Sequence, residues 1–379
     1  MAYDLLIRGG VVIDPSRSME AAGAVAVRGD RIADLPGTGK TDTAQIFDAT
    51  GCLVLPGLID FHAHLFFGGS ELGIDPDSGL LPQGVTTALD AGTAGIANYE
   101  LFSSSIVARS AVRIKSLLNV SPTGLPTSRH HEDVDPRHYD LERTAALFAR
   151  YRGELIGLKV RQSRDIVGSL GLEPLRATVK MAEQLGCPVV VHTTDPPSSP
   201  GELAGLLRPG DVYCHVMNGT GRTVLGPDGV MLAEILQARG RGVLFDAANG
   251  RMHFAFKTAR AALRQLFLPD VISSDVTSMS LYRSPVFGLP YLLSKYLNMG
   301  MPILPAVAAC TSTPARLLGM AKEIGTLAPG ACADIAVFKQ VERPVEFCDT
   351  QGETMTGKTI LVPMLTVRAG RVLYRRPDF

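Results

Sequence analysis

Two histidines stand two positions apart early in the chain, as His62 and His64. On a β-strand, residues i and i+2 point to the same face of the sheet, so a strand here would aim both imidazoles at one point. Neutral imidazole is a common ligand of zinc-like metals. The pair therefore predicts a metal site, while two surface histidines or a satisfied strand pair are the alternatives that the spacing leaves open.

Four further side chains that can bind a metal or move a proton each follow a short apolar run. They are Lys159, His192, His215 and Asp275. The first two intervals between them each match one strand–helix unit, and the interval from His215 to Asp275 matches two. Polar side chains at the carboxyl ends of barrel strands meet at one mouth of the barrel and are typical of active sites. We therefore expect these four side chains and the histidine pair to converge on one opening.

The elements that must position these side chains recur through the middle of the chain as short apolar runs separated by helical stretches. Continuous apolar runs are typical of strands covered on both faces. Eight runs over about 220 residues predict an α/β fold, a (β/α)8 TIM-type barrel, although a doubly wound open sheet would show a similar alternation. The runs are 53–59, 85–89, 114–120, 155–160, 189–191, 212–213, 243–245 and 271–272. Helical stretches such as 174–185, 230–238 and 254–267 lie between them.

Both ends of the chain are strand-like and differ from the middle. Residues 4–13 near the start and 364–368 near the end are β-type runs with turn signals beside them. We expect the two ends to form one small β-sandwich, with the barrel inserted between them. The predicted domains are a sandwich of residues 1–52 plus 327–379 and a barrel of residues 53–326.

Composition narrows the classes of partner. The chain has 379 residues, of which 46% are hydrophobic and 20% charged, a mixture that can bury a sizeable core and excludes a disordered chain. Its 37 basic and 37 acidic side chains balance, so charge gives no case for nucleic acid or an anionic membrane as the partner. No apolar run approaches the roughly 18 residues of a membrane span, and the acidic start lacks the features of a signal peptide. We expect a cytoplasmic protein with a small-molecule substrate.

The complete pattern resembles the amidohydrolase superfamily. That pattern is His-x-His after strand one, Lys on strand four, His on strands five and six, and Asp on strand eight. The flanking runs 56–60 and 325–335 agree with it, and the resemblance covers essentially the whole chain. More narrowly, the chain is similar to the dihydroorotase-like branch often labelled amidohydrolase/deacetylase, whose members have frequently been called dihydroorotases on similarity alone.

The resemblance implies a binuclear site for two divalent metal ions, usually zinc. By position, the more buried metal would be held by His62, His64 and Asp275. The other metal would be held by His192 and His215.

The resemblance also implies a bridge between the two metals. Lys159, carboxylated on its nitrogen by carbon dioxide, would supply it as a carbamate, which behaves as a bidentate carboxylate. The implied reaction is hydrolysis of an ester or amide by a hydroxide that the two metals share. Asp275 would act in it as general base and then as general acid.

The resemblance implies the substrate class less directly than it implies the metal site. The branch implies deacetylation of small acids, and we expect an esterase of O-acetyl α-hydroxy acids of the acetyl-mandelate type. The alternatives are a cyclic amidohydrolase of the dihydroorotase or hydantoinase kind, an N-acyl amino acid deacylase, and a non-catalytic assembly protein, against which the complete ligand set speaks. Dihydroorotases carry an Arg two residues after the second histidine, where this chain has Phe66. A phenyl ring cannot replace a bidentate guanidinium, so this position argues against dihydroorotate.

Several residues are candidates for contact with the substrate. Arg161 follows Lys159 by two positions and would share its face of the strand. The others lie in predicted loops or at strand ends, where solvated-loop, turn, rim or packing roles are open alternatives: His130, Asn218, Tyr282, Arg283 and Phe66. The resemblance also allows a homo-oligomer, since dimers and larger assemblies are common in the superfamily.

Overall fold

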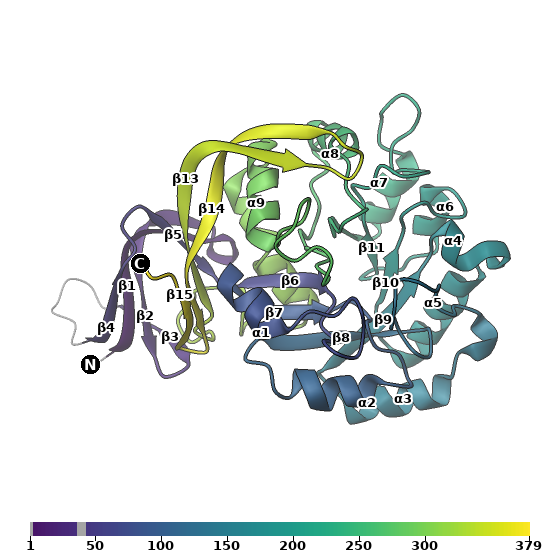
Figure 1. Ribbon diagram of the computed structural model, residues 1–379, viewed down its shortest axis with the longest axis horizontal. Helices are drawn as coiled ribbons and strands as arrows, with labels where there is room; N and C mark the ends of the chain where they lie inside the picture. The colour runs from purple at the N-terminus through teal and green to yellow at the C-terminus, as the bar shows by residue number, and fades with distance from the viewer. Residues whose placement is uncertain (1–2, 36–42) are drawn as a thin grey trace.

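The computed structural model describes residues 3–35 and 43–379 and contains two sheets that lie side by side (Figure 1). The larger part of the chain surrounds a curled sheet in which seven strands follow one another in sequence order, every neighbouring pair parallel. These strands are β6 (Leu58–Ala63), β7 (Val85–Asp90), β8 (Arg113–Asn119), β9 (Leu155–Arg161), β10 (Val189–His192), β11 (Val212–Cys214) and β12 (Leu244–Asp246).

Residues 271–276 close this sheet into a barrel. Single bridges join Val271 to Asp246 of β12 and Val276 to Ala63 of β6. The Asp275 N–H also donates to the His62 carbonyl at 2.7 Å. The predicted TIM-type barrel with a smaller β unit built from both termini is therefore confirmed, and the open doubly wound sheet is excluded.

The second sheet is built from both ends of the chain and is mostly antiparallel, in the order β15-β14-β13-β5-β1-β2-β3, with β4 paired to β1. Apolar side chains from β1, β2, β4, β5, β13 and β14 share one buried cluster, so the sheet curls around its own core. The strands are β1 (Tyr3–Asp14), β2 (Met19–Arg28), β3 (Arg31–Ala33), β4 (Thr43–Asp48), β5 (Cys52–Pro56), β13 (Ile335–Cys348), β14 (Thr354–Arg368) and β15 (Arg371–Arg375).

The predicted first run of the barrel, residues 53–59, is divided between the two sheets. Its first half lies in β5, which pairs with β1 and β13, and its second half lies in β6. The change of sheet falls at Gly57, where an added Cβ would lie 2.2 Å from the Thr86 hydroxyl oxygen. An apolar run shows burial but not which sheet covers it, so the sequence placed the passage from sandwich to barrel four residues early.

Helices cover the outside of the barrel (Figure 1). Of the predicted stretches, 174–185 matches α5 closely, whereas 230–238 and 254–267 correspond to α7 and α8, which begin later. The helices are α1 (Pro76–Leu80), α2 (Tyr99–Phe102), α3 (Leu141–Arg150), α4 (Arg164–Val167), α5 (Glu173–Leu185), α6 (Pro200–Gly205), α7 (Ala233–Gly240), α8 (Phe256–Arg264), α9 (Leu289–Asn298), α10 (Ile303–Ala308) and α11 (Ser312–Leu317). Short 3-10 or π turns are η1 (Pro15–Arg17), η2 (Leu81–Gln83), η3 (Ser103–Val107), η4 (Pro136–His138) and η5 (Gly168–Leu170). Among the described residues, no helix is both long and apolar enough to cross a bilayer.

The hairpin of β13 and β14 extends beyond the terminal sheet and arches over the barrel to α8 (Figure 1). Beyond the end of β13, Thr350 donates to the Phe254 carbonyl from both its N–H, at 3.0 Å, and its hydroxyl, at 2.7 Å. The Asp349 carboxylate accepts the N–H of Phe256 at 3.0 Å, which explains why α8 begins there. This hairpin end therefore fixes the loop between β12 and α8.

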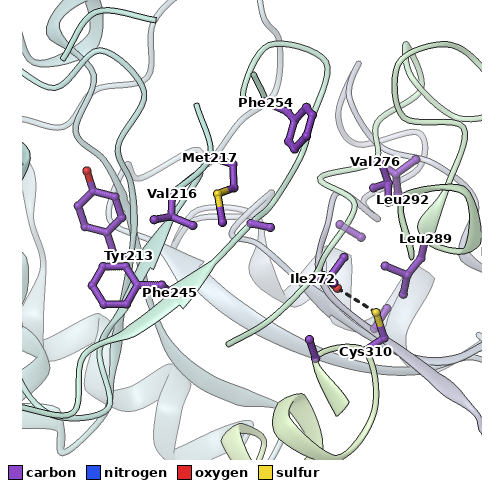
Figure 2. Packing of buried hydrophobic residues seen from close by; sticks show 14 of the residues in the cluster. Tyr213, Val216, Met217, Phe245, Phe254, Ile272, Val276, Leu289, Leu292 and Cys310 are labelled. Atoms are coloured by element: carbon purple, nitrogen blue, oxygen red, sulfur yellow. Dashed lines mark hydrogen bonds between the residues drawn. The ribbon is translucent and has the colours of Figure 1, made fainter. Parts of the chain in front are cut away.

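Residues 271–276, the closing segment of the barrel, pack on their outer side against a buried apolar cluster. Figure 2 shows Ile272 and Val276 packed beside Leu289 and Leu292 of α9. The Cys310 thiol donates to the Ile272 carbonyl across 3.6 Å (Figure 2). All five side chains are at most 1% exposed, so the backbone that carries Asp275 is held by dense packing on its outer side.

Candidate metal centre

The structure brings the six predicted metal ligands together at the carboxyl end of the barrel. His62 lies on β6 with His64 just beyond it, Lys159 on β9 and His192 at the end of β10, while His215 follows β11 and Asp275 lies in the closing segment. Each is at most 8% exposed. All except His215 line one pocket of about 300 Å³. His215 lies against its wall, with its ring centre 4.2 Å from that of His192.

Two left-handed backbone positions help to aim these side chains. His215 has φ = 61° and Asp275 has φ = 50°, a region that costs non-glycine residues free energy and is enriched at functional sites. Both residues lie just where a barrel segment gives way to a loop. The strand alternation used to predict their directions therefore stops at these two residues.

The Asp275 carboxylate lies close to both His62 and His64. Its Oδ1 atom is 3.2 Å from His64 Nε2 and 3.6 Å from His62 Nε2. Lys159 Nζ lies 3.2 Å from the same His62 nitrogen. Several donor atoms thus face one small volume, as metal coordination requires.

Polar groups behind the imidazoles orient them. His64 Nδ1 lies 2.8 Å from the hydroxyl of Thr93, which itself donates to Asp90 at 2.8 Å. His215 Nδ1 donates to the Ala248 carbonyl at 2.7 Å. The carbonyl partner places the His215 proton on Nδ1 and leaves its Nε2 with a free lone pair toward the pocket, the usual arrangement around a ligating histidine. The Thr93 hydroxyl can accept the Nδ1 proton of His64 in the same way when Nε2 binds a metal.

The donor set fits a divalent cation. His215 Nε2 is buried and has no hydrogen-bond partner, and a buried polar atom without a partner calls for a bound group. Donor atoms of His62, His215 and Asp275 all lie within 4.8 Å of one another. Imidazole nitrogen and carboxylate oxygen are the ligands that zinc and similar ions take.

Burial sets the protonation of these groups. It lowers the pKa values of His62, His192 and His215, in each case with help from neighbouring cations. Burial alone would raise the pKa of Asp275, but the hydrogen bond with His64 and the other histidines outweigh it and hold that pKa well below its usual range. Neutral imidazoles beside an ionised carboxylate are the forms that bind metals.

Two predicted substrate contacts, Arg161 and His130, line the same pocket, together with His131, Arg251 and Met252. One guanidinium nitrogen of Arg161 donates to the buried Glu132 carboxylate at 2.9 Å.

Four predicted substrate contacts lie elsewhere. Phe66 is buried under the first loop against Phe102. Asn218 is buried in a turn, where its amide donates to the His215 carbonyl at 2.9 Å. Tyr282 and Arg283 are exposed, and Tyr282 lines a separate pocket at the β13–β14 hairpin. Strand alternation gives no direction for loop side chains, which explains these misplacements.

Two functional candidates escaped the sequence reasoning. Asp246 ends β12 and lies 3.5 Å from His62 Nδ1, so the rule used for the other strand ends could have found it. His253, in the loop before α8, has its ring centre 4.1 Å from that of His215. No spacing rule points to His253, because a loop separates it from the preceding strand.

Comparison with known proteins now identifies the family. The family model described as "Amidohydrolase family" matches residues 53–366. The chain belongs to the amidohydrolase family. It is 35% identical to a protein of Agrobacterium fabrum named as a deacetylase, over 86% of this chain and 80% of that one. Metal-dependent hydrolysis is therefore the chemistry of this barrel, and the family generally uses divalent metals.

Solved structures that resemble this amidohydrolase are described by activities other than deacetylation. A structure described as an adenine deaminase superposes with a TM-score of 0.90 at 26% identity, covering 99% of this chain and 100% of that one. A structure described as a dihydroorotase superposes with a TM-score of 0.88 at 30% identity, covering 97% and 98%. The shared architecture thus supports several hydrolytic activities, and the pocket has to discriminate between them.

Proposed function

We propose that this amidohydrolase is a binuclear deacetylase that hydrolyses the ester of a small carboxylate-bearing substrate, an O-acetyl α-hydroxy acid of the acetyl-mandelate type. The observation that carries the proposal is the position of Arg161. It lies on the wall of the metal pocket, two residues beyond Lys159 on β9. The relative named as a deacetylase supports the acetyl group as the part that is removed.

The proposed metal ligands divide into two sets. The first ion would be held by His62, His64 and Asp275, and the second by His192 and His215. Zinc suits both donor sets. Two divalent cations supply Lewis acidity, which lowers the pKa of a water molecule and polarises a carbonyl group.

Lys159 is proposed to bridge the two ions as a carbamate. The side chain is 1% exposed, and among the described residues no carboxylate oxygen lies within 4.0 Å of its ammonium. A buried cation without a counter-ion is costly. Loss of one proton gives the neutral amine, and addition of that amine to carbon dioxide, with loss of a second proton, gives an anionic carbamate. This anion would remove the cost of the buried cation beside two metals.

Asp275 is proposed to move the proton. Its carboxylate is held in the ionised form and points into the pocket from the closing segment. It would accept a proton from the attacking water and then deliver that proton to the oxygen of the leaving alcohol. The products are acetate and the free α-hydroxy acid.

The lining of the pocket favours an anionic substrate with an apolar group. Outside the six proposed ligands, the basic or imidazole side chains that line it are Arg161, Arg251, His130, His131 and His253, and the one acid is Asp165. Glu132 occupies one nitrogen of Arg161, so the remaining guanidinium N–H groups can bind a substrate carboxylate. Apolar side chains for the rest of the substrate are supplied by Leu72, Leu125, Ile166, Met252 and Met279.

A cyclic amidohydrolase or an N-acyl amino acid deacylase is the second candidate. The dihydroorotase structure at 30% identity favours the cyclic amide. The burial of Phe66 argues against it, because this position offers no cation to the pocket. The same metals and Asp275 would serve either leaving group.

Initial rates of the zinc-loaded protein on one substrate panel test the proposal. The panel holds O-acetyl α-hydroxy acids of both hands, N-acetyl amino acids of both hands, and dihydroorotate. We expect saturable turnover of one O-acetyl enantiomer. Turnover of dihydroorotate or of N-acetyl amino acids alone would overturn the ester assignment, and a purified chain that binds no metal would support the non-catalytic alternative.

A further inference from the structure

A seventh metal-competent side chain, His253, lies at the pocket. It comes from the loop between β12 and α8 and is largely buried, with 16% of its side chain exposed. Its Nδ1 atom lies 2.8 Å from the Thr194 hydroxyl. Its Nε2 atom lies 3.7 Å from Asp275 Oδ2, so this nitrogen faces the cluster of ligands.

Three imidazoles surround the same point. The ring centres of His192, His215 and His253 are separated by 4.2, 4.8 and 4.1 Å. One donor nitrogen from each lies within 4.8 Å of the other two. One of these nitrogens, His215 Nε2, is buried without a hydrogen-bond partner.

We propose that His253 is a third imidazole ligand of the cation assigned to His192 and His215, so that these three histidines can hold a divalent cation without the Lys159 carbamate. This inference rests on the proposed binuclear hydrolase. Three neutral imidazoles with an open fourth position are a donor set that zinc takes in catalytic sites. When the Thr194 hydroxyl accepts the Nδ1 proton, Nε2 of His253 keeps the lone pair that ligation needs.

The loop is built to hold His253 at this distance. Gly250 has φ = +53°, and a Cβ there would lie 2.3 Å from Asp275 Oδ2 and 2.6 Å from His253 Cδ2. The backbone therefore passes closer to the ligands than a side chain would permit. On the other side of His253, the carbonyl of Phe254 accepts both hydrogen bonds from Thr350 of the hairpin.

The proposal predicts an effect on metal binding. If His253 only formed a hydrogen bond to Asp275, that effect would not be expected. The second cation then depends on two independent anchors, the carbamate on β9 and the imidazole of His253. Removal of either should leave a weakened site, and removal of both should weaken it much further. Carbon dioxide should be needed for the bridge but not for retention of one cation.

Metal stoichiometry and affinity test this directly. We would strip the metal from the wild type, His253→Ala, Lys159→Ala and the double variant, reload each with Zn²⁺ or Co²⁺, and measure bound metal and competition with a chelator. We expect Lys159→Ala to retain about one cation and the double variant to bind it at least tenfold more weakly. His131→Ala, which removes another pocket histidine outside the cluster, should leave metal affinity unchanged.

The absorption spectrum of bound Co²⁺ supplies a second readout, because it changes when an imidazole leaves the coordination sphere. His253→Gln preserves the size of the side chain and serves if His253→Ala does not fold. Equal metal affinity and an identical Co²⁺ spectrum in wild type and His253 variants would overturn the inference while leaving the hydrolase intact. A wild-type chain that binds no metal would overturn both proposals.

Discussion

At the residue scale, one charged side chain can be anchored by the protein and still face the pocket. Arg161 illustrates the point. One part of its guanidinium is held by Glu132 at 2.9 Å, while the side chain still lines the pocket. Such anchoring pre-organises the remaining N–H donors, so that less rotamer entropy would be lost if they bind the proposed substrate carboxylate.

Replacement of Arg161 tests its role in recognition. Arg161→Gln should lower kcat/KM for a carboxylate substrate by roughly 10- to 150-fold, the equivalent of about 1.5–3 kcal/mol for hydrogen bonds to a charged group. Most of the loss should appear in KM. The methyl ester of the same substrate is the control, because it lacks the anion. Equal losses on acid and methyl ester would contradict a carboxylate contact.

Lys295 is a buried cation outside the metal centre. Its ammonium donates to the carbonyls of Pro285 and Cys348, at 3.3 and 3.2 Å, and lies 4.3 Å from the ring centre of Phe254. Burial lowers its pKa from 10.5 to about 7, against the opposing attraction of Cys348 and Asp349. Lys295 therefore joins α9 to the hairpin, and the free-energy cost of burying its protonated form depends on pH.

The sign of this pH dependence can be predicted. Between about pH 7 and pH 10.5 the unfolded chain keeps the Lys295 proton that the folded chain releases, so this group makes the protein more stable as pH rises. The free energy of unfolding of the wild type, relative to Lys295→Met, should increase by about 2 kcal/mol from pH 7 to pH 9. Urea unfolding at both pH values measures it, and a difference that does not change with pH would refute the assignment.

At the element scale, the site depends on where strands end and on how the following loops are held. The closing segment 271–276 has packing from α9 on one side and hydrogen bonds to β6 on the other. The loop before α8 is held by the hairpin of β13 and β14. Strand ends and tied loops together give the rigidity that pre-organised ligands need.

Alanine substitutions at two loop glycines can distinguish steric crowding of the ligands from strain in the backbone. Both Gly250 and Gly229 have positive φ, +53° and +78°, but only a Cβ at Gly250 meets Asp275, while one at Gly229 meets nothing within 4 Å. Each alanine variant should lose about 1 kcal/mol of stability. Gly250→Ala should also lower kcat at least about 100-fold by displacing Asp275, and similar kinetics for both variants would contradict this.

At the scale of the whole molecule, the barrel gathers ligands from segments more than 200 residues apart in sequence, as the contact of His62 with Asp275 shows. Without a metal, the buried Nε2 lone pair of His215 has no partner and opposes folding of this mouth. Metal binding should therefore be coupled to global stability.

Removal of the metals tests this coupling. A cation present at 1,000 times its Kd contributes about 4 kcal/mol, so chelation should lower Tm by at least about 5 °C. Reloading with Zn²⁺ should restore it, and Mg²⁺, which prefers oxygen ligands, should restore much less. Calorimetry with and without chelator measures the shift. An unchanged Tm would mean that these residues form no metal site that stabilises the fold.

Local patterns in the sequence were enough to predict the barrel and the strand ends that carry the candidate ligands. Apolar runs, a two-residue histidine spacing and polar residues at strand ends are local patterns, and the two-residue period of a strand fixes which face each side chain takes. The same rule, applied to the seventh run, would also have found Asp246.

The positions of side chains beyond the strand ends depend on contacts between distant segments of the chain. It placed His253 at the ligands and moved Phe66, Asn218, Tyr282 and Arg283 away from the pocket. It also divided the run 53–59 between two sheets. Loop side chains have no period to follow, and their directions come from contacts across the chain, such as that of Thr350 with Phe254, which no local pattern encodes.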